Sequence, residues 1–177
     1  KGNKMRKDYE IILNLIPENS KVLDIGCSDG ELITYLENKG ISAQGVELSQ
    51  EKVIKCLEKG LDVIHGDINL IVEDFPFNQF DYCLLTQTIQ AVQEPDQLLN
   101  TLKKVSKNII VSFNNSARLS KISNFLLTGS FDSLLKKANS DHWYNTDYIH
   151  PCSIKDFKKL ATDLDLKIIS TFDVLSQ

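Results

Sequence analysis

The chain has 177 residues, of which 42% are hydrophobic and 25% are charged, so we expect one globular domain, 1–177, with a single core. A net charge of -4 without a long basic run argues against a nucleic-acid partner. No apolar stretch reaches the length of a membrane span and no secretory signal is visible, so we expect a cytoplasmic protein without a membrane partner.

Four cysteines lie in the sequence, at Cys27, Cys56, Cys83 and Cys152. They form no C-x-x-C pair, so neither a zinc site nor another metal site is expected. We interpret them as reduced thiols, most of them buried.

The first hundred residues alternate between short apolar runs and amphipathic segments. Strands are predicted at residues 21–26, 42–48, 61–67, 80–88 and 108–113, and helices at 10–16, 31–40, 50–59 and 96–105. The third of these helices should start after Ser49 as its N-cap and carry Val53, Ile54 and Leu57. Strands that alternate with helices of about ten residues indicate a parallel sheet with helices on both faces.

The alternation breaks after Phe113. Residues 114–150 are rich in Asn and Ser and contain two short amphipathic segments, so we interpret them as an insertion over the edge of the sheet. We expect a helical lid there, more mobile than the sheet, because loops on a rigid scaffold often carry specificity. A helix at 153–164 with Ser153 as N-cap and a last strand at 167–175 are predicted to follow.

The stretch VLDIGCSDGELITYL, residues 22–36, predicts a buried strand, a turn with two glycines and a helix. Ligands of open α/β sheets bind beyond the carboxyl ends of the strands, where this turn lies. The turn is not a dinucleotide fingerprint, because Ser28 and a glutamate replace the second and third glycines. It is not a P-loop either, because no Lys-Ser/Thr follows its last glycine. Its acids, Asp24 and Asp29, would repel a phosphate and favour a cation.

Two more acids close the next two strands. Glu47, 21 residues after Gly26, suits a ribose diol, because a carboxylate can accept a hydrogen bond from each hydroxyl. Asp67 could accept from an exocyclic amine. A ligand with an ammonium, a sulfonium, a ribose and an adenine but no phosphate fits these positions, and that ligand is S-adenosylmethionine or its demethylated product, S-adenosylhomocysteine. Each acid also has a structural interpretation: Asp24 as a helix cap, Glu47 as a solvated loop acid and Asp67 as a turn former.

With these residues placed, the chain resembles the class I S-adenosylmethionine-dependent methyltransferases and, more closely, the methionine biosynthesis protein MetW family. The resemblance is carried by RKDYEIILNLIPENSKVLDIGCSDGELITYL, GVELS, KCLEKGLDVIHGDIN, DFPFNQFDYCLLTQTIQAVQEP and WYNTDYIHPCSIKDF, which cover most of the chain. It implies a Rossmann-like α/β fold: a mostly parallel, twisted sheet in the order 3-2-1-4-5-7-6, with helices on both faces and an antiparallel last strand. Only Ser176 and Gln177 follow the predicted sixth strand, so we expect the natural protein to continue for roughly 10–20 residues with the missing strand.

The resemblance also implies site residues. The glycine turn would hold the methionine moiety, the second strand end the ribose, the third the adenine and the fourth the sulfonium side. These cofactor-binding positions are Asp24, Gly26, Cys27, Ser28, Gly30, Glu47, Leu48, Asp67, Ile68, Thr86, Gln87 and Thr88. The acceptor-side candidates are Gln90, where many class I enzymes have a histidine, and His142, Trp143, Tyr144 and His150. No catalytic residue is predicted.

The chain departs from the family pattern at two places. The family turn usually reads GCGDG, whereas here Ser28 replaces the middle glycine, which is tolerable if this residue keeps a negative φ. After the fifth strand the family usually has F-P-N-F-G-H-W and this chain has FNNSARL, so the acceptor or partner contact of that loop is not carried over. Trp143 and Tyr144 have an alternative role, which is to pack the insertion onto the core.

Two functions fit the sequence. One is methyl transfer to a small-molecule acceptor, linked to methionine biosynthesis. The other is a non-catalytic, S-adenosylmethionine-binding partner or regulator of a homoserine O-acyltransferase, with which the MetW family is associated. A closed, acid-lined acceptor cavity beside Gln90 would favour the enzyme, and an exposed apolar patch on the insertion would favour the partner.

Overall fold

The computed structural model describes residues 5–131 and 149–174. Contacts divide the chain into two compact units. The sheet unit comprises the described residues of 1–86, 97–112 and 172–177, and the second unit comprises those of 87–96 and 113–171. That both belong to one domain stays a prediction.

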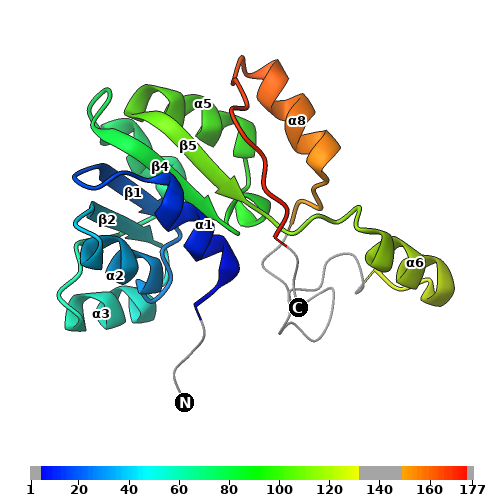
Figure 1. Cartoon of the computed structure of the whole chain (residues 1–177), viewed down its shortest axis with the longest axis horizontal. Helices are drawn as coiled ribbons and strands as arrows, with labels where there is room; N and C mark the ends of the chain where they lie inside the picture. The colour runs from blue at the N-terminus through cyan, green and yellow to red at the C-terminus, as the bar shows by residue number, and fades with distance from the viewer. Residues whose placement is uncertain (1–4, 132–148, 175–177) are drawn as a thin grey trace. The chain divides into compact units, whose positions relative to one another are not determined.

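The sheet unit is built on a parallel sheet (Figure 1). Among the described residues, five strands pair in the order β3-β2-β1-β4-β5, and every pairing is parallel. The strands are β1 (Lys21–Ile25), β2 (Ser42–Glu47), β3 (Val63–His65), β4 (Phe80–Thr86) and β5 (Ser106–Ser112). This confirms the Rossmann-like fold and the first five positions of its strand order. Residues of β1 are buried on both faces, as in sheets that helices cover on both sides.

Helices of the sheet unit cover this sheet. They are α1 (Lys7–Leu15), α2 (Glu31–Asn38), α3 (Gln50–Glu58), the short α4 (Ile68–Ile71) with the 3-10 turn η1 (Val72–Asp74), and α5 (Pro95–Val105), whose first two residues fall in the second unit. Helix α2 packs against β2, α3 packs against β2 and β3, and α1 packs against α2. Leu32, Ile33 and Leu36 of α2 are all buried.

Only some apolar residues of α3 are buried. Helix α3 begins after Ser49 as expected and buries Val53 and Cys56, but Ile54 and Leu57 are 48% and 56% exposed. The sequence offered two apolar stripes, one through residues 53 and 56 and one through 54 and 57. Only one of them can face the core of a surface helix.

The second unit contains η2 (Ile89–Ala91), α6 (Leu119–Thr128) and α8 (Ile154–Asp163). Ser153 caps α8 in a capping box with Asp156, which confirms the predicted N-cap. Helix α6 is one of the two amphipathic segments predicted in the insertion. The other lies largely outside the described residues, and the mobility of a lid at 114–150 stays a prediction.

The predicted strand at 167–175 is wrong for the part of it that the structure describes. Residues 167–174 have no strand pairing, and Ile169 is 81% exposed. An apolar, β-branched run predicts a strand only if a neighbouring backbone supplies hydrogen bonds. In the described chain β5 pairs with β4 alone.

Within residues 5–131 and 149–174, no helix is long and apolar enough to cross a membrane.

Candidate functional site: the glycine turn after β1

The turn between β1 and α2 is tied to the neighbouring strand. Gly26 N–H donates to the carbonyl oxygen of Val46 in β2 at 2.8 Å. Gly26 and Gly30 have φ angles of +71° and +76°, which favour glycine. A Cβ on Gly30 would lie 2.3 Å from Cδ1 of Leu61, so this glycine is needed for space as well. The two glycines therefore fix a tight turn at the carboxyl end of β1.

Ser28, between these glycines, does not have the negative φ on which its tolerance was argued. Its φ is +55°, which costs a residue with a side chain roughly 1–2 kcal/mol. Two hydrogen bonds hold it in place: its N–H donates to Oε2 of Glu47 at 2.9 Å, and its carbonyl oxygen accepts from the Cys56 thiol at 3.3 Å. The turn keeps the shape of a glycine turn with a strained serine inside it.

Glu47 at the end of β2 is buried and fully oriented. Its Oε2 accepts from Ser28 N–H and its Oε1 accepts from Ser49 N–H, both at 2.9 Å. Each carboxylate oxygen has a second lone-pair direction, so the group can still accept from a diol. Glu47 is therefore not a solvated loop acid, although its role toward a ribose stays a prediction.

Asp24 is the most deeply buried acid of the site. Its side chain is 1% exposed, and Oδ1 has no hydrogen-bond partner among the described residues. Burial raises the pKa of this carboxyl to about 7, the charge of Arg6 opposes the rise, and the charge of Glu47 adds to it. A buried carboxyl left in this state is suited to a cationic or hydrogen-bond-donating ligand group.

Asp67 and its neighbours follow β3. Oδ1 of Asp67 accepts from the backbone N–H of Asn69 at 2.9 Å and from its side-chain amide at 2.8 Å, so Asp67 caps α4. Ile68 beside it is buried, whereas Leu48 is 67% exposed. The structural interpretation of Asp67 is thus correct for one oxygen, and its contact with an adenine stays a prediction.

Cys27 lies inside the turn as a buried thiol. Burial raises its pKa, and the charge of Asp24 adds to this effect, so the thiolate that a nucleophile requires is disfavoured. A Cβ on Gly45 would come within 2.6 Å of its sulfur, so Gly45 leaves room for this side chain. All four cysteines fall in the described residues and are free, and three are buried, as predicted.

Gln90 belongs to the second unit and is 2% exposed. Its Nε2 donates to the carbonyl oxygens of Asn114 and His150, both at 3.3 Å, and its Oε1 accepts from Asn114 N–H at 2.9 Å. Its own carbonyl oxygen accepts from the backbone N–H groups of Ile149 and His150. The side-chain amide is thus used to join three segments of backbone.

The predicted site residues fall into three groups. The sheet unit holds Asp24, Gly26, Cys27, Ser28, Gly30, Glu47, Leu48, Asp67, Ile68 and Thr86, while the second unit holds Gln87, Thr88, Gln90 and His150. His142, Trp143 and Tyr144 lie outside the described residues. The strand ends bring the first group to one edge of the sheet, where Ser28 and Glu47 bond directly.

Sequence reasoning assigned no role to the start of α1. Arg6, the N-cap residue of this helix, is hydrogen-bonded to Asp8 and Tyr9. Its positive charge lowers the pKa of Asp24, against the effect of burial. The only signal in the sequence was the Arg-x-Asp-Tyr pattern in front of an apolar helix.

Solved structures with similar folds define the class. A SAM-dependent methyltransferase from Archaeoglobus fulgidus superposes with a TM-score of 0.65 at 19% identity, covering 88% of this chain and 68% of that one. The cyclase SpnF superposes with a TM-score of 0.63 at 17% identity, covering 89% of this chain and 55% of that one. These likenesses establish the fold, which is that of the class I S-adenosylmethionine-dependent methyltransferases.

The family follows from the sequence comparisons. The chain belongs to the family described as methionine biosynthesis protein MetW, which it matches over residues 6–177. It is 32% identical over 170 residues to the bifunctional methionine biosynthesis protein MetXA/MetW of Rhodopirellula baltica. The match covers 91% of this chain but 27% of that relative, so the chain spans about a quarter of its length.

Proposed function

We propose that this protein binds S-adenosylmethionine or S-adenosylhomocysteine at the carboxyl ends of β1, β2 and β3 and transfers a methyl group to a small-molecule acceptor. The observation that carries the proposal is Oδ1 of Asp24, a buried oxygen without a partner among the described residues. Such a group destabilises a fold unless a ligand completes it. The acids of this edge match a ligand with an ammonium, a ribose and no phosphate.

The chemical step would rest on positioning. When bound, S-adenosylmethionine supplies an electrophilic methyl group on sulfur. Gln90 uses its amide on backbone groups, and Nε2 of His150 lies 3.1 Å from the carbonyl oxygen of Gln93. We therefore assign no general base. We expect an acceptor that is nucleophilic without deprotonation by the protein and that is held in line with the methyl group.

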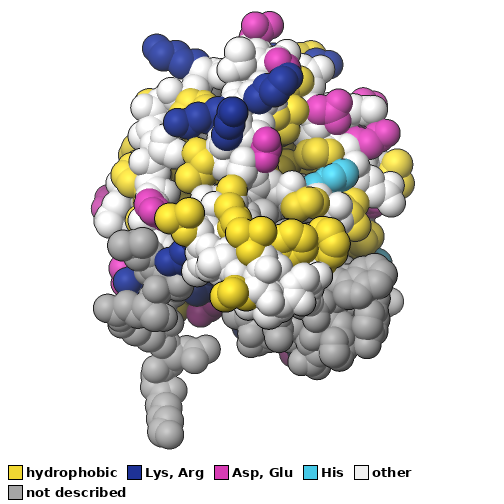
Figure 2. All heavy atoms as spheres, turned by 90° about the vertical axis from the view of Figure 1, so that its right-hand side faces the viewer, with side chains coloured by type: hydrophobic (Ala, Val, Ile, Leu, Met, Phe, Trp, Pro, Cys, Tyr) yellow, Lys and Arg dark blue, Asp and Glu magenta, His cyan; other side chains and the backbone are white. Residues whose placement is uncertain are grey.

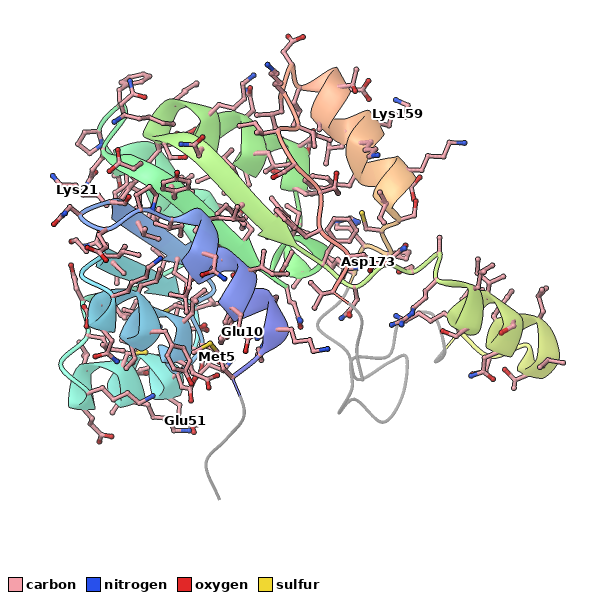
Figure 3. All side chains as sticks on the ribbon, in the orientation of Figure 1. Met5, Glu10, Lys21, Glu51, Lys159 and Asp173 are labelled. Carbon is pink, nitrogen blue, oxygen red and sulfur yellow. The ribbon has the colours of Figure 1, made fainter. Side chains whose placement is uncertain are left out.

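Calorimetry with S-adenosylhomocysteine tests the binding site. Glu47→Ala should weaken binding at least about tenfold, because it removes a charged acceptor. Glu51→Ala is the matched control: this glutamate, labelled in Figure 3, is exposed on α3 and pairs with Lys55, so the affinity should not change. An unchanged affinity in Glu47→Ala would overturn the ribose assignment.

Catalysis is tested separately, by assaying S-adenosylhomocysteine release over a panel of small metabolites that includes methionine-pathway intermediates. Release above the background of the cofactor alone, lost in Asp24→Asn, would support the enzyme. Binding without release on any acceptor would contradict the methyl-transfer part of the proposal and leave the cofactor site standing.

A second candidate function is that of a partner or regulator of a homoserine O-acyltransferase. One observation favours it: α6 in the insertion has no buried residue, and Leu119, Leu126 and Leu127 are 82%, 76% and 86% exposed. Figure 2 shows hydrophobic side chains on the described surface. The name of the Rhodopirellula baltica relative joins MetXA and MetW in one bifunctional protein, which supports an acyltransferase as the partner.

Mixing the two purified proteins tests this second candidate. A variant with Leu126→Gln and Leu127→Gln should bind the acyltransferase at least about tenfold more weakly, because each leucine would lose a buried contact of roughly 1.5 kcal/mol or more. Leu57→Gln on α3, which changes a 56% exposed leucine, is the control. Equal binding by all three proteins would exclude α6 as the contact.

A further inference from the structure

Two of the four cysteines contact the same carbonyl oxygen. The Cys56 thiol of α3 donates to the carbonyl oxygen of Ser28 at 3.3 Å, and the Cys27 sulfur lies 4.0 Å from that oxygen. Helix α3 packs directly on the turn here, because a Cβ on Gly30 would lie 3.1 Å from the Cys56 sulfur. Two thiols that are far apart in the sequence thus meet at one place in the sheet unit.

The two thiols are also hydrogen-bonded to each other. Burial raises the pKa of both, and the hydrogen bond between them raises the pKa of Cys27 further but lowers that of Cys56. Cys27 is therefore the donor of this bond and Cys56 the acceptor. The charge of Lys59, the C-cap residue of α3, also lowers the pKa of Cys56. Cys56 is thus the thiol of the pair that ionises more readily.

This contact is suited to a disulfide, in which the two sulfurs must approach to about 2 Å. Thiols that share one acceptor and bond to each other need only a small further approach. Both side chains belong to the hydrophobic core cluster, so a disulfide between them would bury no new polar group. The other buried cysteine, Cys83, has the Ser106 hydroxyl as its hydrogen-bond partner instead of a thiol.

We propose that Cys27 and Cys56 are a redox-regulated pair, which hydrogen peroxide oxidises to a disulfide that weakens the proposed cofactor site. First, the Cys56 sulfur attacks the peroxide: the O–O bond breaks, an S–O bond forms, and the thiol proton leaves with the other hydroxyl as water. The Cys27 sulfur then attacks the sulfur of this sulfenic acid: the S–O bond breaks, the S–S bond forms, and the Cys27 proton leaves with the hydroxyl as water. A small, uncharged oxidant is required because both thiols are buried.

The disulfide would act on the turn because Cys56 would lose the proton that it donates to Ser28. Ser28 has a φ of +55°, and its backbone is held there by this thiol and by the carboxylate of Glu47. Without the thiol donor, and with Cys27 drawn toward α3, the N–H of Ser28 should no longer be aligned with Glu47. The effect on ligand binding rests on the proposed function, whereas the formation of the disulfide does not.

Mass spectrometry of the full chain tests the disulfide. The protein is treated with hydrogen peroxide, its remaining thiols are blocked with iodoacetamide, and it is digested with trypsin without a reductant. Because lysines lie at positions 21, 39, 55 and 59, peptides 22–39 and 56–59 should appear linked and should separate after dithiothreitol is added. Cys83→Ser, at the other buried cysteine, is the matched control and should form the same link, whereas Cys56→Ser should not. The absence of this link in the wild-type chain overturns the inference.

Calorimetry with S-adenosylhomocysteine before and after peroxide treatment tests the regulation. The affinity of the wild-type chain should fall at least about tenfold on oxidation, as for a lost hydrogen bond to a charged group, and should return with dithiothreitol. In Cys56→Ser the same treatment should change the affinity by less than about twofold, and this ratio within one protein is independent of its starting affinity. A linked peptide with unchanged affinity overturns the inference while the proposed cofactor site stands. No binding by the reduced wild-type chain overturns both.

Discussion

The sheet unit and the second unit differ in whether a buried polar side chain finds hydrogen-bond partners. In the sheet unit, Asp24 keeps a carboxylate oxygen without a partner in the described chain, beside a strained Ser28. In the second unit, Gln90 uses both ends of its amide on the backbone. A buried polar group without a hydrogen-bond partner lowers the stability of the fold, so its presence is best explained by a ligand that it binds. A buried polar group whose hydrogen bonds are all made within the protein needs no ligand to explain it.

Their helices differ in the same sense. Helix α2 of the sheet unit buries three apolar residues, but α6 of the second unit buries none and exposes leucines such as Leu126. The sheet unit thus holds a buried hydrophobic core and, beside it, a polar site in which one buried carboxylate oxygen has no partner in the described chain. In the second unit the buried amide of Gln90 is hydrogen-bonded, and α6 exposes apolar side chains. This unit is therefore a better place to look for a protein partner than for a cofactor.

The largest expected effect is on thermal stability, on replacing Asp24 in the sheet unit. Because the folded-state pKa is raised from 3.8 to about 7, its carboxyl favours the fold below about pH 4, and this contribution is lost as the pH rises to about 7. Ionising it there costs the fold on the order of 4 kcal/mol. In the ligand-free protein, Asp24→Asn should therefore raise the melting temperature at pH 8 by several degrees and at pH 5 by much less.

Thermal unfolding across this pH range checks the prediction. Asp81→Asn is the control of opposite sign, because Lys107 and the backbone N–H of Lys21 hold the pKa of Asp81 below its usual value. It should lower the melting temperature at pH 8. If Asp24→Asn were the less stable protein at pH 8, its carboxylate would have a structural partner and the contrast would fail.

The same pKa predicts how ligand binding depends on pH. Pairing with a ligand ammonium requires ionised Asp24, so the affinity for S-adenosylhomocysteine should rise about fivefold between pH 6 and pH 7, about twofold more by pH 8, and level off above. Calorimetry in buffers of different ionisation enthalpy should also detect the proton released on binding. A flat profile, with no proton released, would exclude Asp24 as the ammonium partner.

Replacing Gln90 tests whether the buried amide of the second unit serves the stability of the fold and not the binding of a ligand. Gln90→Met keeps the volume but removes three hydrogen bonds, so the protein should lose roughly 2 kcal/mol and melt about 4–8 °C lower. The affinity for S-adenosylhomocysteine should stay unchanged, because Asp24 and Glu47 lie in the sheet unit. Gln44→Met, which loses one surface bond to Asp62, is the control. A tenfold loss of affinity without a lower melting temperature would return Gln90 to the ligand site.

Much of the sheet unit could be predicted from the sequence, because its strands and helices are indicated by patterns of residues that are close together in the chain. Apolar runs alternating with amphipathic segments define a parallel sheet, and in such a sheet acids at successive strand ends share one edge. Thus Asp24 and Glu47 were placed correctly without knowledge of any contact.

What the sequence could not predict depends on partners far along the chain. Gln90 bonds residues 24 and 60 positions away, and nothing in its neighbourhood indicates this. The run at 167–174 has strand-like residues but no strand to pair with in the described structure. The positive φ of Ser28 is fixed by its bond to Glu47, 19 residues later.

The smallest expected effect concerns Ser28. Ser28→Gly should relieve the left-handed backbone and stabilise the protein by about 1 kcal/mol or less, after the greater flexibility of glycine in the unfolded chain is counted. Asn78, also at positive φ (53°), is the control, because asparagine tolerates this conformation and Asn78→Gly should gain little. Chemical denaturation of both variants gives the comparison. A destabilised Ser28→Gly would show that the serine side chain has a use in the turn.

The two ends of the predicted insertion are joined by hydrogen bonds between described residues. Asn115 forms a bridge with Cys152, Ser116 N–H donates to the carbonyl oxygen of Cys152 at 2.9 Å, and Gln90 accepts from Ile149 and His150. Once a chain segment is closed at its base, doubling its length costs only about 0.6 kcal/mol of further entropy. The chain between residues 117 and 148 is therefore free to lengthen, shorten or change sequence over evolution at little cost to folding, which makes it the place where related proteins can diverge in what they contact.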